Sequence, residues 1–213
     1  MIRKLLFLSA VVSIMAACAS AGNIVTNGTF IGGGAGDLTG WTTTTCTTCD
    51  AAGWAVSGLS GDGGMVPTDT TFNAEDSCVG PTCNDPVLGD TLSQVLATDP
   101  TQTYTLTFLF DPGPDTEETT ELDILWNGSL VTDGQIVNPT TSTWALYTFS
   151  GLTTGGTSTN LEFTARQDPA TLFLTDISVT GSGGSSVPEP ASLLLIGGGL
   201  LGMGALLRRK RKA

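Results

Sequence analysis

An alternation of apolar residues with threonine constrains the fold of this chain more than any other feature. Tyr104, Leu106, Phe108 and Phe110 alternate with three threonines, which is the period-2 pattern of a half-buried β-strand. The chain is also rich in threonine, carries 28 Gly and has only 13% charged residues. Threonine favours strands and glycine favours turns, so this composition argues against a helical bundle and for an all-β body.

Further strand patterns recur between turn residues. Leu122, Ile124 and Trp126 alternate with acidic residues, and Asn127-Gly128 predicts a hairpin turn into a strand at 129–131. Other strands are predicted at 23–26, 54–57, 92–97, 143–149, 160–165 and 172–180, the last with a bulge around Asp176. We therefore predict one all-β domain at 22–180, a single β-sandwich of jelly-roll type.

The charge distribution excludes several classes of function. All 20 Asp and Glu residues lie between Gly22 and Glu189, where Arg166 is the one basic residue. Such a body repels phosphate backbones, so nucleic acid is excluded as a partner. The chain has no His, which excludes Ser-His-Asp and Cys-His catalysis and any His-ligated metal. The acidic residues indicate solubility outside the cell or, as an alternative, binding of Ca²⁺.

The N-terminus has the pattern of a secretory signal peptide at 1–21. Two basic residues precede a short apolar run, and a small-x-small site formed by Ala19 and Ala21 follows. Signal peptidase is expected to cleave after Ala21 and free Gly22. An alternative is lipidation of Cys18, because the preceding Met-Ala-Ala resembles a bacterial lipoprotein box.

The C-terminus has the pattern of a second targeting signal. An uncharged segment at 191–207 has the length of a short transmembrane helix, and a basic tail at 208–212 would hold its end in the cytoplasm. Val187, Pro188, Glu189 and Pro190 precede this helix, after a Gly/Ser linker at 181–186. An ordinary C-terminal anchor is one interpretation.

Together, residues 187–213 resemble the PEP-CTERM sorting signal. That resemblance implies an exported Gram-negative protein, held transiently in the inner membrane and cleaved by an exosortase at or near 187–190. The body would then reach the cell surface or the extracellular matrix, in an envelope rich in exopolysaccharide.

The body also resembles galactose-binding-like β-sandwiches, which include many carbohydrate-binding modules. The matching pieces are 27–30, 37–41 and 174–179. Such modules often hold a structural Ca²⁺ near their paired first and last strands, which implies Asp176 as a metal ligand here. Thr175 stands where a second Asp is expected, and Ile31 stands where Glu is common.

Three sets of residues carry the remaining candidate chemistry. The four tryptophans, Trp41, Trp54, Trp126 and Trp144, could stack on sugar rings, but core packing is the favoured interpretation for each, since Trp126 is in phase with Leu122 and Ile124. Trp41 and Trp54 are the candidates for an exposed platform. Four cysteines follow the signal peptide, and in an exported protein they predict disulfides, preferably local ones, over metal or redox chemistry. They are Cys46, Cys49, Cys78 and Cys83. Four carboxylates at 111–118 lack EF-hand spacing and indicate a solvated loop.

These patterns predict a non-enzymatic surface or matrix protein. A calcium-supported carbohydrate-binding module for exopolysaccharide is the alternative. A carboxylate glycosidase is a remote third hypothesis, because paired acids occur by chance in so acidic a chain.

Overall fold

The structure is a computed structural model that describes residues 22–32, 36–49, 53–59, 71–83, 85–113, 119–168 and 170–182. The predicted signal peptide, Cys18, the PEP motif and the apolar segment after it lie outside these residues. Within the described ranges no helix is long and apolar enough to cross a membrane.

The described residues form ten strands and no helix, as the all-β prediction requires. The strands are β1 (Thr42–Thr44), β2 (Ala55–Gly58), β3 (Phe72–Asp76), β4 (Thr91–Ala97), β5 (Thr103–Asp111), β6 (Thr119–Trp126), β7 (Ser129–Val137), β8 (Ala145–Thr153), β9 (Ser158–Asp168) and β10 (Leu172–Gly181).

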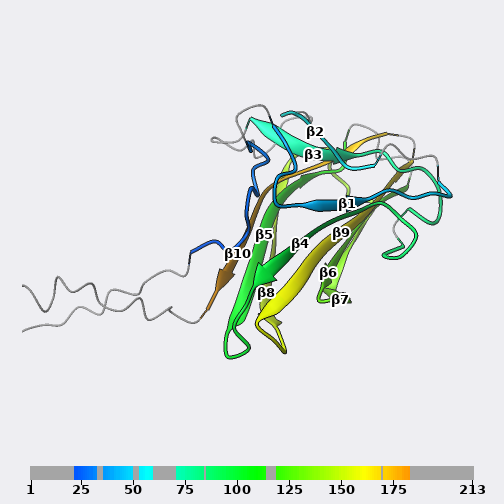
Figure 1. Cartoon of the computed structure of the whole chain (residues 1–213). Coiled ribbons are helices and arrows are strands. Elements are labelled where there is room, and N and C mark those ends of the chain that lie inside the picture. Colours follow the sequence, from blue (N-terminus) through cyan, green and yellow to red (C-terminus); the bar gives the residue numbers. More distant parts are fainter. Residues whose placement is uncertain are drawn as a thin grey trace, which may run out of the picture. The chain divides into compact units, whose positions relative to one another are not determined.

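The strands pair in two antiparallel sheets that face each other (Figure 1). One sheet has the order β1-β4-β9-β6-β7, and the other has the order β2-β3-β10-β5-β8. Because β7 and β8 end their respective sheets, both are edge strands. The β-sandwich prediction is confirmed.

The core lies between the sheets and uses the alternation seen in the sequence. Phe108 on β5 is fully buried, and its ring meets that of Phe163 on β9 edge-on at 5.4 Å between centroids. Phe110 is also fully buried, and so are Leu122 and Ile124 on β6. Two half-buried sheets therefore close around one apolar layer, as a sandwich does.

Two local predictions are confirmed. Asn127 and Gly128 have φ of 54° and 76°, and Trp126 pairs with Ser129 across them, as in a type I′ hairpin. The pairing of β10 with β5 shifts register between Thr175 and Ser178, which places the expected bulge around Asp176.

One strand prediction was wrong, and two strands of the structure were not predicted. Residues 23–26 are not a strand in the structure: Ile24 N donates to Val179 O at 2.9 Å, but no ladder follows. Strands β1 and β3 were not predicted. The three threonines of β1 are all exposed, and β3 turns Ala74 and Asp76 inward, so neither shows an apolar alternation.

Candidate functional site

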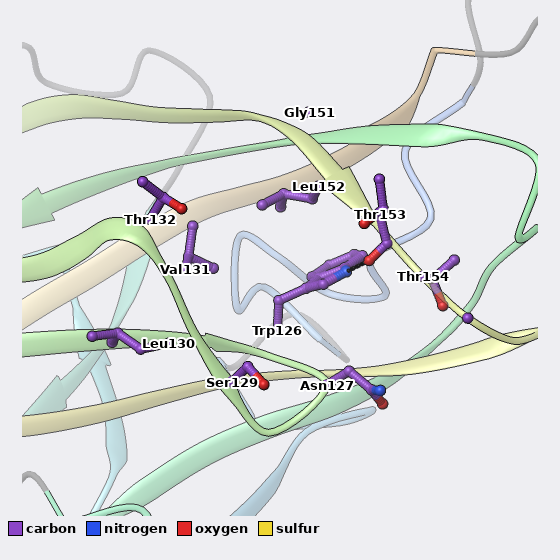
Figure 2. A pocket seen from close by; sticks show the side chains of 11 residues that line it. Trp126, Asn127, Ser129, Leu130, Val131, Thr132, Gly151, Leu152, Thr153 and Thr154 are labelled. Carbon is purple, nitrogen blue, oxygen red and sulfur yellow. Dashed lines mark hydrogen bonds between the residues drawn. The ribbon is translucent and has the colours of Figure 1, made fainter.

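A groove runs between the edge strands β7 and β8, where the two sheets part. It consists of two adjoining cavities of about 360 Å³ and 350 Å³. Both cavities are lined by Val131 and Thr132 from β7 and by Gly151 and Leu152 from β8. We call this feature the β7/β8 groove (Figure 2).

The floor of the groove is apolar. Val131, Phe149 and Leu152 are 7–9% exposed, and so is Trp126 at the end of β6. Figure 2 shows the Trp126 ring between the two edge strands. The indole Nε1 donates to Thr153 O at 2.8 Å, and the ring lies 5.8 Å from that of Tyr104. These contacts hold the ring in place at the floor of the groove.

The walls of the groove are polar but almost uncharged. Asn127 contributes a side-chain amide and Asp133 a carboxylate. The other polar lining residues carry hydroxyls: Ser129, Thr132, Thr148, Ser150, Thr153 and Thr154. Among the described residues that line the two cavities, Asp133 is the single ionisable group.

An apolar floor with hydroxyl and amide walls suits a pyranose ring. The C–H face of a sugar packs against aromatic and aliphatic side chains, and its hydroxyls exchange hydrogen bonds with the walls. Hydrolysis of a glycosidic bond needs two carboxyl groups, one on each side of the bond. The lining of the groove has one carboxylate, Asp133, and so lacks this pair.

A second set of polar groups lies on the outer face of the β9-β6-β7 sheet. Burial raises the pKa of Asp123 to about 6, and the nearby charge of Glu121 adds to the shift. Burial also raises the pKa of Glu162. Gln135 Nε2 donates to Glu121 Oε1 at 2.6 Å. None of these residues lines either cavity of the β7/β8 groove.

The two candidates for stacking on sugar, Trp41 and Trp54, lie in the core. Trp41 is 8% exposed, and its Nε1 donates to Asn27 O at 3.1 Å. Trp54 is 5% exposed. Core packing therefore describes them, since little of either ring is open. Trp126 is buried to a similar degree, at 7% exposed, but it also lines one of the two cavities. In the sequence, its phase with Leu122 and Ile124 favours core packing over a binding surface.

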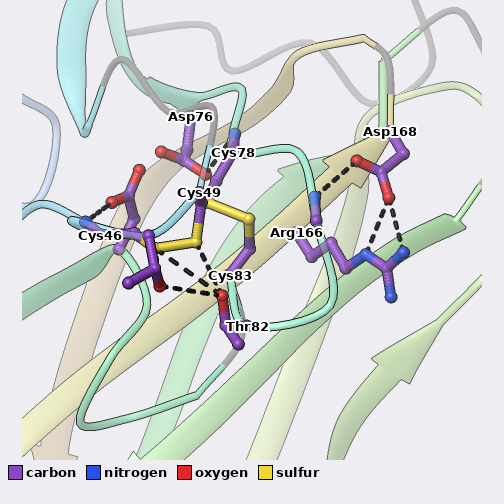
Figure 3. The surroundings of a disulfide bond; sticks show 11 residues. Cys46, Cys49, Asp76, Cys78, Thr82, Cys83, Arg166 and Asp168 are labelled. Carbon is purple, nitrogen blue, oxygen red and sulfur yellow. Dashed lines mark hydrogen bonds and ion pairs between the residues drawn. A yellow bond between two sulfur atoms is a disulfide. The ribbon is translucent and has the colours of Figure 1, made fainter.

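The cysteines pair locally, as predicted. Cys46 bonds to Cys49 and Cys78 bonds to Cys83, with Cα–Cα distances of 5.5 Å and 5.6 Å. Figure 3 shows the two disulfides packed together beside Thr82, whose hydroxyl lies 3.0 Å from the sulfur of Cys49. Each disulfide lies within one loop, the first after β1 and the second after β3. The packing of the two disulfides brings these loops into contact. The cluster is a structural element at one end of the sandwich.

The surroundings of Asp176 give a fit test for calcium. Asp176 is exposed with φ of 54°. Ile177 N donates to Gly28 O at 2.9 Å, so the N-terminal segment does lie beside β10. Two backbone carbonyls of this segment already accept hydrogen bonds from an amide, however: Asn27 Nδ2 donates to Asp37 O at 2.9 Å and to Thr39 O at 3.2 Å. An amide donor takes the place of a cation in this loop, so the residues fit calcium poorly.

No potential metal cluster in the described residues includes Asp176. Among the residues that the structure describes, the group of three potential ligands close enough to hold an ion consists of Cys46, Cys49 and Cys78. All three are engaged in disulfides. Calcium binding at Asp176 stays a prediction for experiment.

Solved structures similar to this fold are carbohydrate-binding-module β-sandwiches. TmCBM61, solved in complex with β-1,4-galactotriose, has 12% identity and a TM-score of 0.52, and the match covers 74% of this chain and 97% of that one. The CBM22-1 xylan-binding domain of Paenibacillus barcinonensis Xyn10C has 12% identity and a TM-score of 0.48, covering 78% and 97%. At such identities the likeness shows the fold alone.

A third similar structure belongs to an enzyme. The enzymatically active domain of tailspike protein 4 from bacteriophage CBA120 has 15% identity and a TM-score of 0.50. The match covers 75% of this chain but only 21% of the tailspike chain, so this protein spans about a fifth of its length. Among curated proteins, none matches the sequence.

The C-terminal residues belong to a recognised signal. Residues 186–212 match the family model of the PEP-CTERM protein-sorting motif. The described body is thus a β-sandwich similar in fold to carbohydrate-binding modules, and residues 186–212 behind it carry a PEP-CTERM sorting motif.

Proposed function

We propose that this protein is an exported, exosortase-processed surface or matrix protein whose β-sandwich binds a glycan without cleaving it. The observation that carries the binding proposal is the β7/β8 groove, with its apolar Trp126 floor and hydroxyl walls. The observation that carries export is the sorting motif at 186–212. The single carboxylate of the groove, Asp133, favours binding over hydrolysis.

Processing at both ends has a direct test. Intact mass is measured for the protein recovered from each cell fraction of its native host. We expect a mass that begins at Gly22 and ends near 187–190. A membrane-bound mass that retains the basic tail at 208–212 would make the C-terminus a plain anchor and overturn the exosortase step.

Glycan binding is tested by blocking the groove. Thr132 is exposed on β7 and lines both cavities, so Thr132→Trp fills the groove without adding charge. Val95 is 72% exposed on β4, a strand toward the other edge of that sheet, and Val95→Trp is the matched control. Retention on a panel of immobilised polysaccharides should fall at least about tenfold for Thr132→Trp, a loss of roughly 1.4 kcal/mol.

Two outcomes would contradict the proposal. Equal retention of Thr132→Trp and Val95→Trp would remove binding from the groove. New reducing ends in the bound polysaccharide, formed by the wild-type chain and lost in Asp123→Asn, would show a glycosidase that uses the outer carboxyls.

A further inference from the structure

The groove lies in a body that has almost no positive charge. Between Gly22 and Glu189 the sequence has 20 acidic residues and no Lys or His, and Arg166 is the one basic residue. A glycan that approaches this surface meets a negative potential, which attracts cations and repels anions over about a Debye length.

The guanidinium of Arg166 already forms an ion pair with a carboxylate of the body. Arg166 Nε and Nη2 donate to Asp168 Oδ2 at 2.9 Å and 2.6 Å, as Figure 3 shows. Arg166 lines neither cavity of the groove. A uronate, sulfate or phosphate group on a bound sugar would therefore find no cation in the described lining to compensate its loss of hydration.

The groove does offer a partner for a positive charge. Asp133 is exposed on β7 and lines the second cavity together with Thr148 and Ser150 of β8. A carboxylate next to hydroxyl groups pairs with the ammonium of an amino sugar, while the hydroxyls accept its remaining hydrogens.

From this arrangement we infer that the β7/β8 groove selects a glycan with free amino groups, such as a de-N-acetylated amino-sugar polymer, and rejects acidic glycans. This inference rests on the proposed glycan-binding function and names the class of its ligand. Asp133 supplies the local contact, and the acidic body supplies the attraction at longer range.

Two oligosaccharides that differ in N-acetylation, and therefore in charge, provide the test. Titration calorimetry of the full-length chain in mild detergent compares a β-1,4-glucosamine hexamer with its fully N-acetylated form, and a galacturonate hexamer serves as the acidic probe. We expect the amine form to bind about fivefold more tightly than the acetylated form at ~20 mM salt. Because salt screens the charges, this ratio should approach one at ~0.5 M.

A matched pair of variants separates the groove from the general charge of the body. Asp133 and Asp176 are both exposed, with φ of 58° and 54°, and asparagine tolerates this backbone region well. Asp133→Asn should lower the affinity for the amine hexamer roughly two- to fivefold, as expected for the loss of an exposed ion pair. Asp176→Asn removes the same charge away from the groove and should have a smaller effect.

Other outcomes would contradict the charge selection, its location in the groove, or glycan binding itself. Equal binding of the amine and acetylated hexamers at every salt concentration leaves glycan binding intact and removes the charge selection, as does preference for galacturonate. Equal losses in Asp133→Asn and Asp176→Asn assign the attraction to the whole body instead of the groove. Absence of binding to any hexamer or to any polysaccharide of the panel overturns the proposed function itself.

Discussion

Asp76 and Asp90 face each other at one end of the sandwich, and each holds one of the two disulfide loops. Asp76 Oδ2 accepts a hydrogen bond from Cys78 N at 3.2 Å, and Asp90 Oδ1 accepts one from Cys46 N. The other oxygens of both carboxyls are buried, and no donor in the described residues reaches them. The two groups therefore satisfy each other only when one of them holds a proton.

This pair predicts that the fold is most stable in acid. Burial, with the charge of Asp90 next, raises the pKa of Asp76 from 3.8 to about 8. The folded state keeps a proton that the unfolded state releases above pH 3.8, so the free energy of unfolding falls as pH rises and levels off near pH 8. We expect urea denaturation to show a loss on the order of 5 kcal/mol between about pH 4 and pH 9.

Asp76→Asn isolates this effect from the other acids. An asparagine still accepts from Cys78 N and donates to Asp90 without needing a proton. The variant should be more stable than the wild type at about pH 9, and its pH dependence should be shallower. Parallel pH profiles for the two proteins would show that the pair does not share a proton.

Each disulfide should contribute modestly to stability, because each closes a short loop. The cysteines of the two pairs, Cys46–Cys49 and Cys78–Cys83, are separated by 3 and 5 positions in the sequence, and loops of this length give roughly 2 kcal/mol in the chain-entropy model. Replacing both cysteines of one pair by alanine should lower Tm by about 4–8 °C, measured by calorimetry. A larger loss for Cys78/Cys83 would point to the packing of these two fully buried residues.

Gly28 should be the glycine least tolerant of alanine in the N-terminal segment. A Cβ at this position would overlap the backbone oxygen of Ile177 on β10, so Gly28→Ala must push the segment away from the sheet. We expect a loss of roughly 1–3 kcal/mol in the free energy of unfolding by urea. At Gly155, an added Cβ would meet no other atom within 4 Å, so the control variant Gly155→Ala should lie within ~0.5 kcal/mol of the wild type.

Calcium should have little effect on the stability of the body. The amide of Asn27 already donates to the carbonyl of Asp37, so a cation is not needed to hold the N-terminal loop. We expect EDTA and ~5 mM Ca²⁺ to give melting temperatures within about 1 °C, since a specific tight site would raise stability by mass action. A calcium-dependent rise that Asp176→Asn abolishes would restore the predicted metal site.

Sequence patterns predicted the parts of this protein that depend on neighbours along the chain. The alternation from Tyr104 to Phe110 identified a buried face because successive side chains of a strand point to opposite sides. Asn127-Gly128 identified a hairpin because both residues tolerate positive φ. The short spacing of the cysteines in each pair favoured local disulfides because residues a few positions apart are already close in space. The sorting motif is also a linear signal, and the family model confirms it.

The tertiary structure decided which distant residues meet. Trp126, Val131 and Leu152 form one groove because β7 and β8 end opposite sheets on the same side of the sandwich, a relation that no period along the chain encodes. The sequence likewise gives no sign that Asp76 and Asp90 are buried. They are buried together because β3 and the loop before β4 meet in the fold. Strand order depends on the summed packing of both sheets, so the site follows from the fold and not from any single segment.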